Sequence, residues 1–473
     1  MNKDYIKTSN KYPEAVPYII GNEAAERFSY YGMRSILSTF LVAQFFNPSH
    51  NPQLQEMAEA QSNEKVHLFV AIAYFMPLVG ALLADWFWGK YKVILYVSIL
   101  YCFGHLMLSV FEQNLDLFSF GLLIIAIGAG GIKSNVTANV GDQFNKSNRH
   151  LMDKVYSWFY FSINLGSVVS NILIPIIYDK YGAKWAFGIP GILMALATLT
   201  FYLGRKKYVK VPPSGINKNN FVFISVYALF NLKKKIANQH WLDVAKNNFE
   251  PQKVEDVKAV YNILGVFAFI PIFWALWDQN LAEWVLQAAK LDLNTHIGFV
   301  LLPEQVQVFN PLFLISFIPV FTYIVYPYLA KKGFRNTPIQ RIGAGFLLTA
   351  LSFVIIASIQ TSIDQGGKPS VWWQILAYLI LAWGEILVYL TGLEYAYTNA
   401  PKTMKSTITA LFLATVSIGN LLVSYINHNI TEKGFFAQLS GALYFWFFAG
   451  LMCVSFVLFV LTSKNLKETK YVD

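Results

Sequence analysis

The polar stretch RKKYVKVPPSG, residues 205–215, opens the longest interruption in a strongly apolar chain. The interruption runs to residue 256, and apolar runs of about 20 residues, the length that crosses a bilayer as a helix, lie on both sides of it. Six runs precede it and six follow it. We therefore expect an N-terminal six-helix bundle (1–204), a linker (205–256), and a C-terminal six-helix bundle with a short tail (257–473).

The composition predicts an all-α integral membrane protein. Hydrophobic residues make up 55% of the chain and charged residues 14%, against about 25% charged in a soluble domain. The first residues, MNKDYIKTSNKYPE, are polar, so we expect no cleaved signal peptide and a first span that acts as the insertion signal. The twelve predicted spans lie near 17–46, 64–86, 92–112, 117–137, 155–178, 185–204, 257–282, 308–330, 340–361, 371–398, 406–428 and 439–462.

The distribution of positive charge predicts the orientation of these spans. About 27 of the 37 Lys and Arg residues fall in loops on the side of both termini, and about six fall in the opposite loops. By the positive-inside rule, both termini are then cytoplasmic in a multi-pass plasma (inner) membrane protein. Because topology accounts for the net charge of +10, we expect the lipid bilayer as a partner and no nucleic acid.

The linker and one short loop point to a fold. The apolar segment NFVFISVYALFNL, residues 220–232, is too short to span, so we predict an interfacial helix and no extra pair of spans. The loop ADWFWGK resembles the major facilitator loop pattern through Asp85, Gly89 and Lys90, although Trp86 replaces its usual arginine. Two six-helix halves joined by a basic linker also resemble this superfamily, which implies the major facilitator fold.

The first predicted span carries charged residues within NEAAERFSYYGMR, residues 22–34. An ionisable group at the bilayer centre costs roughly 2.5–3.5 kcal/mol, so such groups usually face a cavity or a partner. At about 100° per residue the polar positions form one stripe. They are Glu23, Glu26, Arg27, Tyr30 and Arg34, with Tyr31 at the margin. The stripe predicts either a functional cavity or a structural ladder of salt bridges, because Glu23 and Arg27 are an i, i+4 pair.

Further charged residues lie in other spans. Lys133 follows the glycine-rich sequence AIGAGGI, and burial would favour an acidic partner, for which Glu385 is the candidate. Arg34 likewise requires a partner, and Asp278 is the candidate. Each pair would join the two halves, and alternating access requires pairs that form and break across them. His67, near the outer end of the second span, is either functional or an interfacial histidine.

Several motifs resemble the proton-dependent oligopeptide transporter family. EAAERFSYYG (23–32) matches the signature E-x-x-E-R-F-x-Y-Y-G, and FYFSINLGS (159–167) resembles the family's second signature. Further family-like segments are GAGGIKSNV (128–136), GDQF (141–144), HWLDVAK (240–246), FWALWDQN (273–280), NPLF (310–313) and TGLEYAYTNAPKTMKS (391–406). The matches run in order from the first to the eleventh predicted span.

The resemblance implies a proton-coupled symporter that carries di- and tripeptides into the cell by alternating access, driven by the inward proton gradient. A zwitterionic peptide needs cations for its carboxylate and acceptors for its amine. The implied peptide-binding residues are Tyr30, Tyr31, Arg34, Tyr74, Lys133, Tyr160, Asn164, Trp274, Asn310 and Glu385. The implied proton-coupling residues are Glu23, Glu26, Arg27 and His67. Arg34–Asp278 and Lys133–Glu385 would be the gating salt bridges.

The sequence departs from the family pattern at three positions. Glu283 stands where animal members carry an arginine, and Thr322 stands where they carry its acidic partner, so we expect that inter-helix pair to be absent. Phe412 replaces a common tryptophan and is expected to reshape one wall of the pocket. The loop 362–370 is too short for the external domain of animal members.

Three alternatives stay open. The same fold carries another anionic or zwitterionic solute in related proteins. A membrane-embedded enzyme would need a nucleophile–base set or metal ligands, and the sequence has no such motif. A transporter-like receptor usually has long cytoplasmic extensions. We expect no enzyme activity, no metal, no cofactor besides protons as the coupling ion, and function as a monomer.

Overall fold

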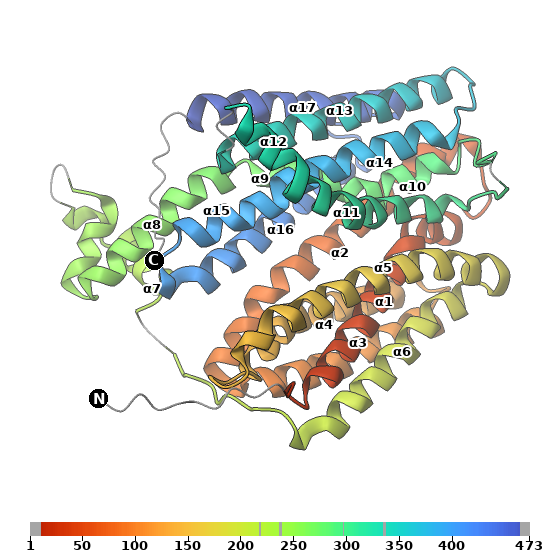
Figure 1. Ribbon diagram of the computed structural model, residues 1–473. Coiled ribbons are helices and arrows are strands. Elements are labelled where there is room, and N and C mark those ends of the chain that lie inside the picture. The colour runs from red at the N-terminus through yellow and green to blue at the C-terminus, as the bar shows by residue number, and fades with distance from the viewer. Residues whose placement is uncertain (1–10, 217–218, 236–238, 297, 334–336, 464–473) are drawn as a thin grey trace.

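The computed structural model describes residues 11–216, 219–235, 239–296, 298–333 and 337–463. The described chain is helical apart from connecting loops and two isolated β-bridges, which confirms the predicted all-α fold. The helices form two bundles that lie beside each other along one long axis (Figure 1). Each bundle has its own core of buried apolar side chains.

The N-terminal bundle contains six long helices. They are α1 (Val16–Leu41), α2 (Gln55–Leu83), α3 (Lys90–Val110), α4 (Leu115–Asp142), α5 (Met152–Tyr181) and α6 (Ala183–Leu203). Small residues let these helices approach closely. A Cβ added at Gly80 of α2 would lie 2.8 Å from the Cα of Gly131 in α4. This contact lies in the glycine-rich segment that precedes Lys133, so it fixes the position of that lysine.

The C-terminal bundle contains spans that are more often interrupted. Its helices are α8 (Pro251–Phe267), α9 (Ile270–Trp277), α10 (Glu283–Ala288), α11 (Phe309–Val320), α12 (Tyr326–Lys331), α13 (Pro338–Asp364), α14 (Val371–Glu385), α15 (Thr391–Asn399), α16 (Lys405–Thr431) and α17 (Gly441–Ser463). A π-helical turn, Ile386–Leu390, joins α14 to α15 directly after Glu385. Such wide turns often occur at functional sites.

The predicted number of spans agrees with the described helices. Ten helices are long and apolar enough to cross a membrane, and α8 with α9–α10 forms an eleventh candidate bent by 46°. Helix α1 carries four charged residues, so its composition alone does not identify it, but its 26 residues measure about 39 Å at 1.5 Å per residue. The molecule is therefore a multi-pass membrane protein, and the eleven candidates together with α1 are consistent with twelve passes within the described residues.

The linker contains two short helices and no extra span in its described residues. Helix α7 (Phe221–Phe230) has ten residues, and a 3₁₀ helix follows at Trp241–Asn247. The next helix begins at Pro251, six residues before the predicted span at 257, because proline suits the first turn of a helix and Val254 is already buried. We call the end of the molecule that bears this linker the linker end, and the opposite end the far end.

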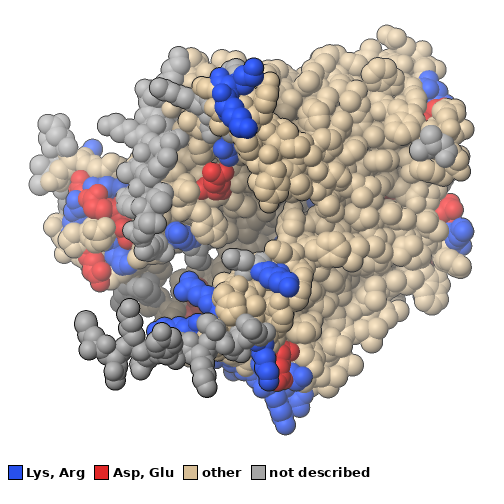
Figure 2. Space-filling model, viewed as in Figure 1, with Lys and Arg blue, Asp and Glu red and all other residues tan. Residues whose placement is uncertain are grey.

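The two bundles are joined at the far end and separate toward the linker end. Contacts between them include Lys290 Nζ to Glu59 Oε1 at 2.8 Å and Ser417 Oγ to the Ala71 carbonyl at 2.7 Å. Figure 2 shows a hollow between the bundles that opens toward the linker end, where most charged side chains of this face also gather. The structure is therefore closed at the far end.

Candidate functional site

The charged stripe of α1 forms a compact buried cluster. Arg27 Nε lies 2.7 Å from Glu23 Oε1 and 3.1 Å from Glu26 Oε2. Both carboxylates are essentially inaccessible to solvent. Glu23 Oε2 and Glu26 Oε1 have no hydrogen-bond partner among the described residues. One guanidinium thus serves two buried carboxylates, so the cluster keeps acceptor capacity for a proton or a further donor.

Lys133 lies between aromatic rings of the N-terminal bundle. Its Nζ is 4.1 Å from the ring centroid of Tyr30 and 4.0 Å from that of Tyr74. The ammonium group is stabilised by the negative faces of these rings. It has no hydrogen-bond partner among the described residues. Lys133 therefore has free donors, although its charge is partly compensated.

Glu385 is held within the C-terminal bundle instead of by Lys133. Its Oε2 accepts hydrogen bonds from Trp277 Nε1 at 2.7 Å and from Asn310 Nδ2 at 3.1 Å. The predicted Lys133–Glu385 salt bridge is thus wrong for this state. The bundles separate toward the linker end, so the carboxylate takes its partners from its own bundle. The contact with Asn310 brings together two residues implied to bind a peptide amine.

Arg34 and Asp278 join the bundles at the far-end side of the hollow. Arg34 Nη2 lies 2.6 Å from Asp278 Oδ1, and both side chains are buried. Asp278 Oδ2 accepts a hydrogen bond of 2.7 Å from Asn420 Nδ2. Arg34 Nε has no partner among the described residues. The expected partners therefore meet, and the role of this pair as a gate stays a prediction.

His67 extends this network across the interface. Its Nδ1 lies 2.7 Å from Asn420 Oδ1, and its Nε2 lies 3.0 Å from both carboxylate oxygens of Glu283. The side chain is fully buried, so the interpretation of His67 as an interfacial histidine is wrong. Figure 1 shows α2, which carries His67, against the C-terminal bundle that supplies both partners.

Asn420 orients the His67 ring within this network. Asn420 Nδ2 donates to Asp278 and to the Val416 carbonyl, which leaves Asn420 Oδ1 as the acceptor that faces His67 Nδ1. His67 Nε2 then faces the Glu283 carboxylate, so the imidazole and the carboxylate form a contact across the two bundles that can hold a proton.

Glu283 and Asn420 are site residues that the sequence analysis missed. Thr322 donates to the Ile318 carbonyl of its own helix at 2.8 Å, so no Glu283–Thr322 pair forms. Glu283 instead accepts from His67 and from Tyr444 Oη at 3.0 Å. A polar residue in the apolar run around Asn420 was the available signal. Its partners lie on other spans, which spacing along one helix cannot reveal.

The implied aromatic residues divide between the bundles. Tyr30 contacts Tyr31 edge-on, with ring centroids 5.5 Å apart. In the other bundle, Trp274 lies 5.4 Å from Trp277 and 5.7 Å from Tyr389. Phe412 is fully buried, and its ring centroid lies 5.8 Å from that of Tyr389, so it packs against one of these aromatic residues.

Tyr160 and Asn164 are placed on α5. Asn164 Nδ2 donates to the Tyr160 carbonyl at 2.9 Å, which leaves its Oδ1 for another contact. The Tyr160 side chain is substantially exposed and Asn164 is nearly buried. Their contact with a peptide stays a prediction.

Comparisons with known proteins agree with this architecture. A family model described as PTR2, POT family, matches residues 91–447. Human solute carrier family 15 member 2 is 36% identical over 81% of this chain and 54% of its own length. Peptide transporter family 1 of Drosophila melanogaster is 38% identical over 75% of this chain and 48% of its own length. The chain spans about half the length of the curated relatives it matches.

Solved structures match nearly the whole chain. The POT family transporter PepTSo superposes with a TM-score of 0.88 at 34% identity, covering 96% of this chain and 99% of that one. An auto inhibited POT family peptide transporter superposes with a TM-score of 0.87 at 32% identity, covering 98% and 99%. Sequence and fold agree along both bundles, and this chain therefore belongs to the POT family.

Proposed function

We propose that this protein is a proton-coupled symporter that carries di- and tripeptides into the cell by alternating access. One observation carries the proposal, because buried polar atoms are nearly always hydrogen-bonded. Among the described residues, unpartnered buried polar atoms occur in several parts of both bundles, and they include cationic, carboxylate and aromatic groups at the implied peptide and proton positions. The atoms at these positions are Glu23 Oε2, Glu26 Oε1, Tyr30 Oη, Arg34 Nε, Lys133 Nζ and Trp274 Nε1.

Opposite charges on the two bundles suit a zwitterionic peptide. Lys133 and Arg34 belong to the N-terminal bundle and have donors available for a peptide carboxylate. Glu385, with Asn310 beside it, belongs to the C-terminal bundle and suits a peptide amine. A peptide that replaces the missing Lys133–Glu385 contact would draw the bundles together at the linker end.

The α1 cluster is the proposed site of proton coupling. Protonation of Glu23 or Glu26 would weaken one of the two ion pairs of Arg27. The guanidinium would then move toward the carboxylate that is still charged. The His67–Glu283 pair is a second place where a proton is held across the two bundles. Movement of a proton at His67–Glu283 would change a contact that joins the halves, which is what coupling requires.

The excess of Lys and Arg in the linker-end loops supports cytoplasmic termini, and uptake into the cell places the protein in the plasma membrane. The hollow then faces the cytoplasm, and the state is inward-open. We propose that the protein works as a monomer, because each set of implied residues is complete within one chain. Protons are the proposed coupling ion, with no bound cofactor.

The test is uptake of labelled dialanine into proteoliposomes under an imposed inward proton gradient. We expect accumulation above the no-gradient control and its loss in Glu385→Gln, which keeps the shape of the side chain but removes its charge. The exposed Glu432→Gln, at the far end, is the matched control. Oriented protein that accumulates no dialanine would overturn the proposal, and gradient-driven uptake of nitrate instead would favour an anion as solute.

A further inference from the structure

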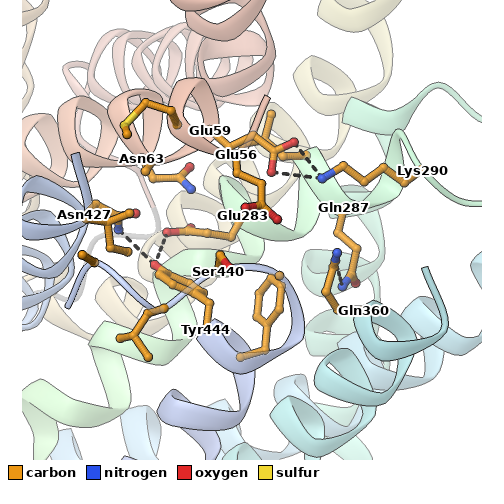
Figure 3. A pocket seen from close by; sticks show the side chains of 18 of the residues that line it. Glu56, Glu59, Asn63, Glu283, Gln287, Lys290, Gln360, Asn427, Ser440 and Tyr444 are labelled. Carbon is orange, nitrogen blue, oxygen red and sulfur yellow. Dashed lines mark hydrogen bonds and ion pairs between the residues drawn. The ribbon is translucent and has the colours of Figure 1, made fainter. Parts of the chain in front are cut away.

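A cavity of about 460 Å³ lies at the far end, outside the closed contact between the bundles, and its wall combines apolar side chains with several polar and charged ones. It is lined by α2 of the N-terminal bundle and by α10, α13, α16 and α17 of the C-terminal bundle. Its volume falls within the range of small-molecule sites, about 300–1,000 Å³. The residues of the central site on α1, α4 and α14 do not line it. Figure 3 shows its polar side chains converging from both bundles.

Two charged side chains of this cavity are unpaired among the described residues. Lys290 forms an ion pair with Glu59 at 2.8 Å, and Glu283 is hydrogen-bonded to His67 and to Tyr444. Glu56 and Lys433 also line the cavity, and neither belongs to an ion pair in the described part of the chain. One carboxylate and one ammonium without an ion-pair partner therefore lie at the exposed rim of a cavity that both bundles line.

Asn63 provides the second observation. Its side chain is only 5% exposed, yet its Oδ1 has no hydrogen-bond partner among the described residues. Figure 3 shows the Asn63 amide directed from α2 into the space between Glu56, Glu283, Ser440 and Tyr444. A buried amide oxygen without a donor is costly, and a ligand that donates a hydrogen bond would relieve that cost.

We infer that this cavity is a second, outer binding site for a zwitterionic peptide, occupied before the far end opens. Asn63 Oδ1 and Glu56 receive the ammonium group, and Lys433 receives the carboxylate. The choice of a peptide as ligand rests on the proposed function, whereas the site itself rests on the cavity and on Asn63. The Glu283 carboxylate lines the cavity and also holds His67, so the outer ligand lies beside the interface network.

The experiment measures binding from outside without requiring transport. Ala437, an exposed residue that lines the cavity, is replaced in Ala437→Cys, with Cys102→Ala and Cys453→Ala in the same full-length chain in lipid nanodiscs. The probe is dialanine, and the readout is the rate of labelling by a membrane-impermeant maleimide. We expect dialanine to slow labelling in this parent and equally in Glu385→Gln, in which the central site is impaired.

Substitutions of Asn63 test the assignment of the amide. Asn63→Leu should require about tenfold more dialanine for the same protection, because a hydrogen bond to a charged amine is lost, whereas Asn63→Asp should retain protection. Glu56→Gln, an exposed position that does not threaten folding, should weaken protection, and Glu432→Gln outside the cavity should not. Protection that survives Asn63→Leu and Glu56→Gln but disappears in Glu385→Gln would overturn the outer site, as would no protection in any chain.

Uptake separates this inference from the proposed function. In proteoliposomes, Asn63→Leu should raise the external dialanine concentration for half-maximal uptake and leave the maximal rate unchanged. If the parent chain transports no dialanine but is still protected, the outer site stands and the proposed function fails. If it transports dialanine with no effect of Asn63→Leu on either protection or uptake, the outer site fails alone.

Discussion

Arg34 of α1 and Asp278, directly after α9, join the two bundles through a buried contact of 2.6 Å between Nη2 and Oδ1. Asn420 fixes the other carboxylate oxygen of Asp278 and links it to His67, which in turn meets Glu283. The ion pair is therefore one end of a chain of polar contacts that crosses the interface three times. We therefore expect a change of charge at any member to alter the closure of the far end.

Loss of Asp278 should destabilise this closed state. Asp278→Asn leaves Arg34 buried without a counter-charge, and removal of one partner of a buried pair costs about 3–5 kcal/mol. We expect a lower thermal unfolding temperature in detergent and loss of gradient-driven uptake. Lys207→Gln is the control, because this lysine is exposed and its contacts, to Glu14 at 3.7 Å and to Tyr18 Oη at 3.2 Å, lie at the surface, where ion pairs contribute little to stability. Equal stability of Asp278→Asn and the parent would contradict the assignment.

Neutralisation of the α1 carboxylates should separate proton coupling from peptide movement. In Glu23→Gln or Glu26→Gln the residue no longer competes as a carboxylate for Arg27. We expect gradient-driven accumulation of dialanine to be lost while exchange of labelled for unlabelled dialanine across the membrane continues. Both assays use the same proteoliposomes, so a folding defect would abolish both. Full accumulation in the double variant would exclude these residues as the coupling site.

The aromatic rings around Lys133 should contribute more to stability and to dialanine binding than the hydroxyl groups of the same tyrosines do. Tyr74→Leu removes one of two aromatic faces about 4 Å from the Lys133 ammonium, and a desolvated contact of this kind contributes about 2 kcal/mol. We expect lower thermal stability and weaker dialanine binding in Tyr74→Leu, and values near those of the parent in Tyr74→Phe. Equal losses in the two variants would assign the effect to the hydroxyl group instead.

The linker should respond to acid through Asp243. Partial burial acts to raise the pKa of Asp243, but hydrogen bonds from Lys246 and Lys258 outweigh it and lower the pKa from 3.8 to about 2. The carboxylate therefore stabilises the fold at pH values above 3.8, and this contribution is lost as the pH falls toward 2. Because Lys246 is partly exposed, we expect the Asp243 carboxylate to contribute about 1 kcal/mol to the free energy of unfolding.

Asp243→Asn tests this pH dependence. The variant should unfold at a lower temperature than the parent between pH 7 and pH 5, and the difference should shrink as the pH falls below 4. Glu250→Gln, an exposed carboxylate of the same linker, should show little difference at any pH. A difference that stays constant down to pH 2.5 would show that the Asp243 charge is not responsible.

Features that depend on local sequence patterns were predicted better than contacts between residues far apart in the chain. The stripe of α1 followed from spacing within one helix, and its residues lie together because the helix is regular through Leu41. The twelve passes followed from the length of apolar runs. The Lys133–Glu385 pair failed because it depends on the state of the two bundles. The His67–Glu283 contact was missed because it joins residues 216 positions apart.

The π-helical turn at Ile386–Leu390 changes how the tenth span must be read. A π turn contains about one residue more than an α turn. Around the helix axis, the residues after Leu390 are therefore rotated by about 100° from the positions that a continuous α-helix would give them. A helical wheel drawn through the whole span consequently assigns Glu394 to the wrong side relative to Glu385. Deletion of one residue within this turn would rotate α15 as a unit, together with the Glu394 carboxylate that contacts Arg341 at 3.1 Å.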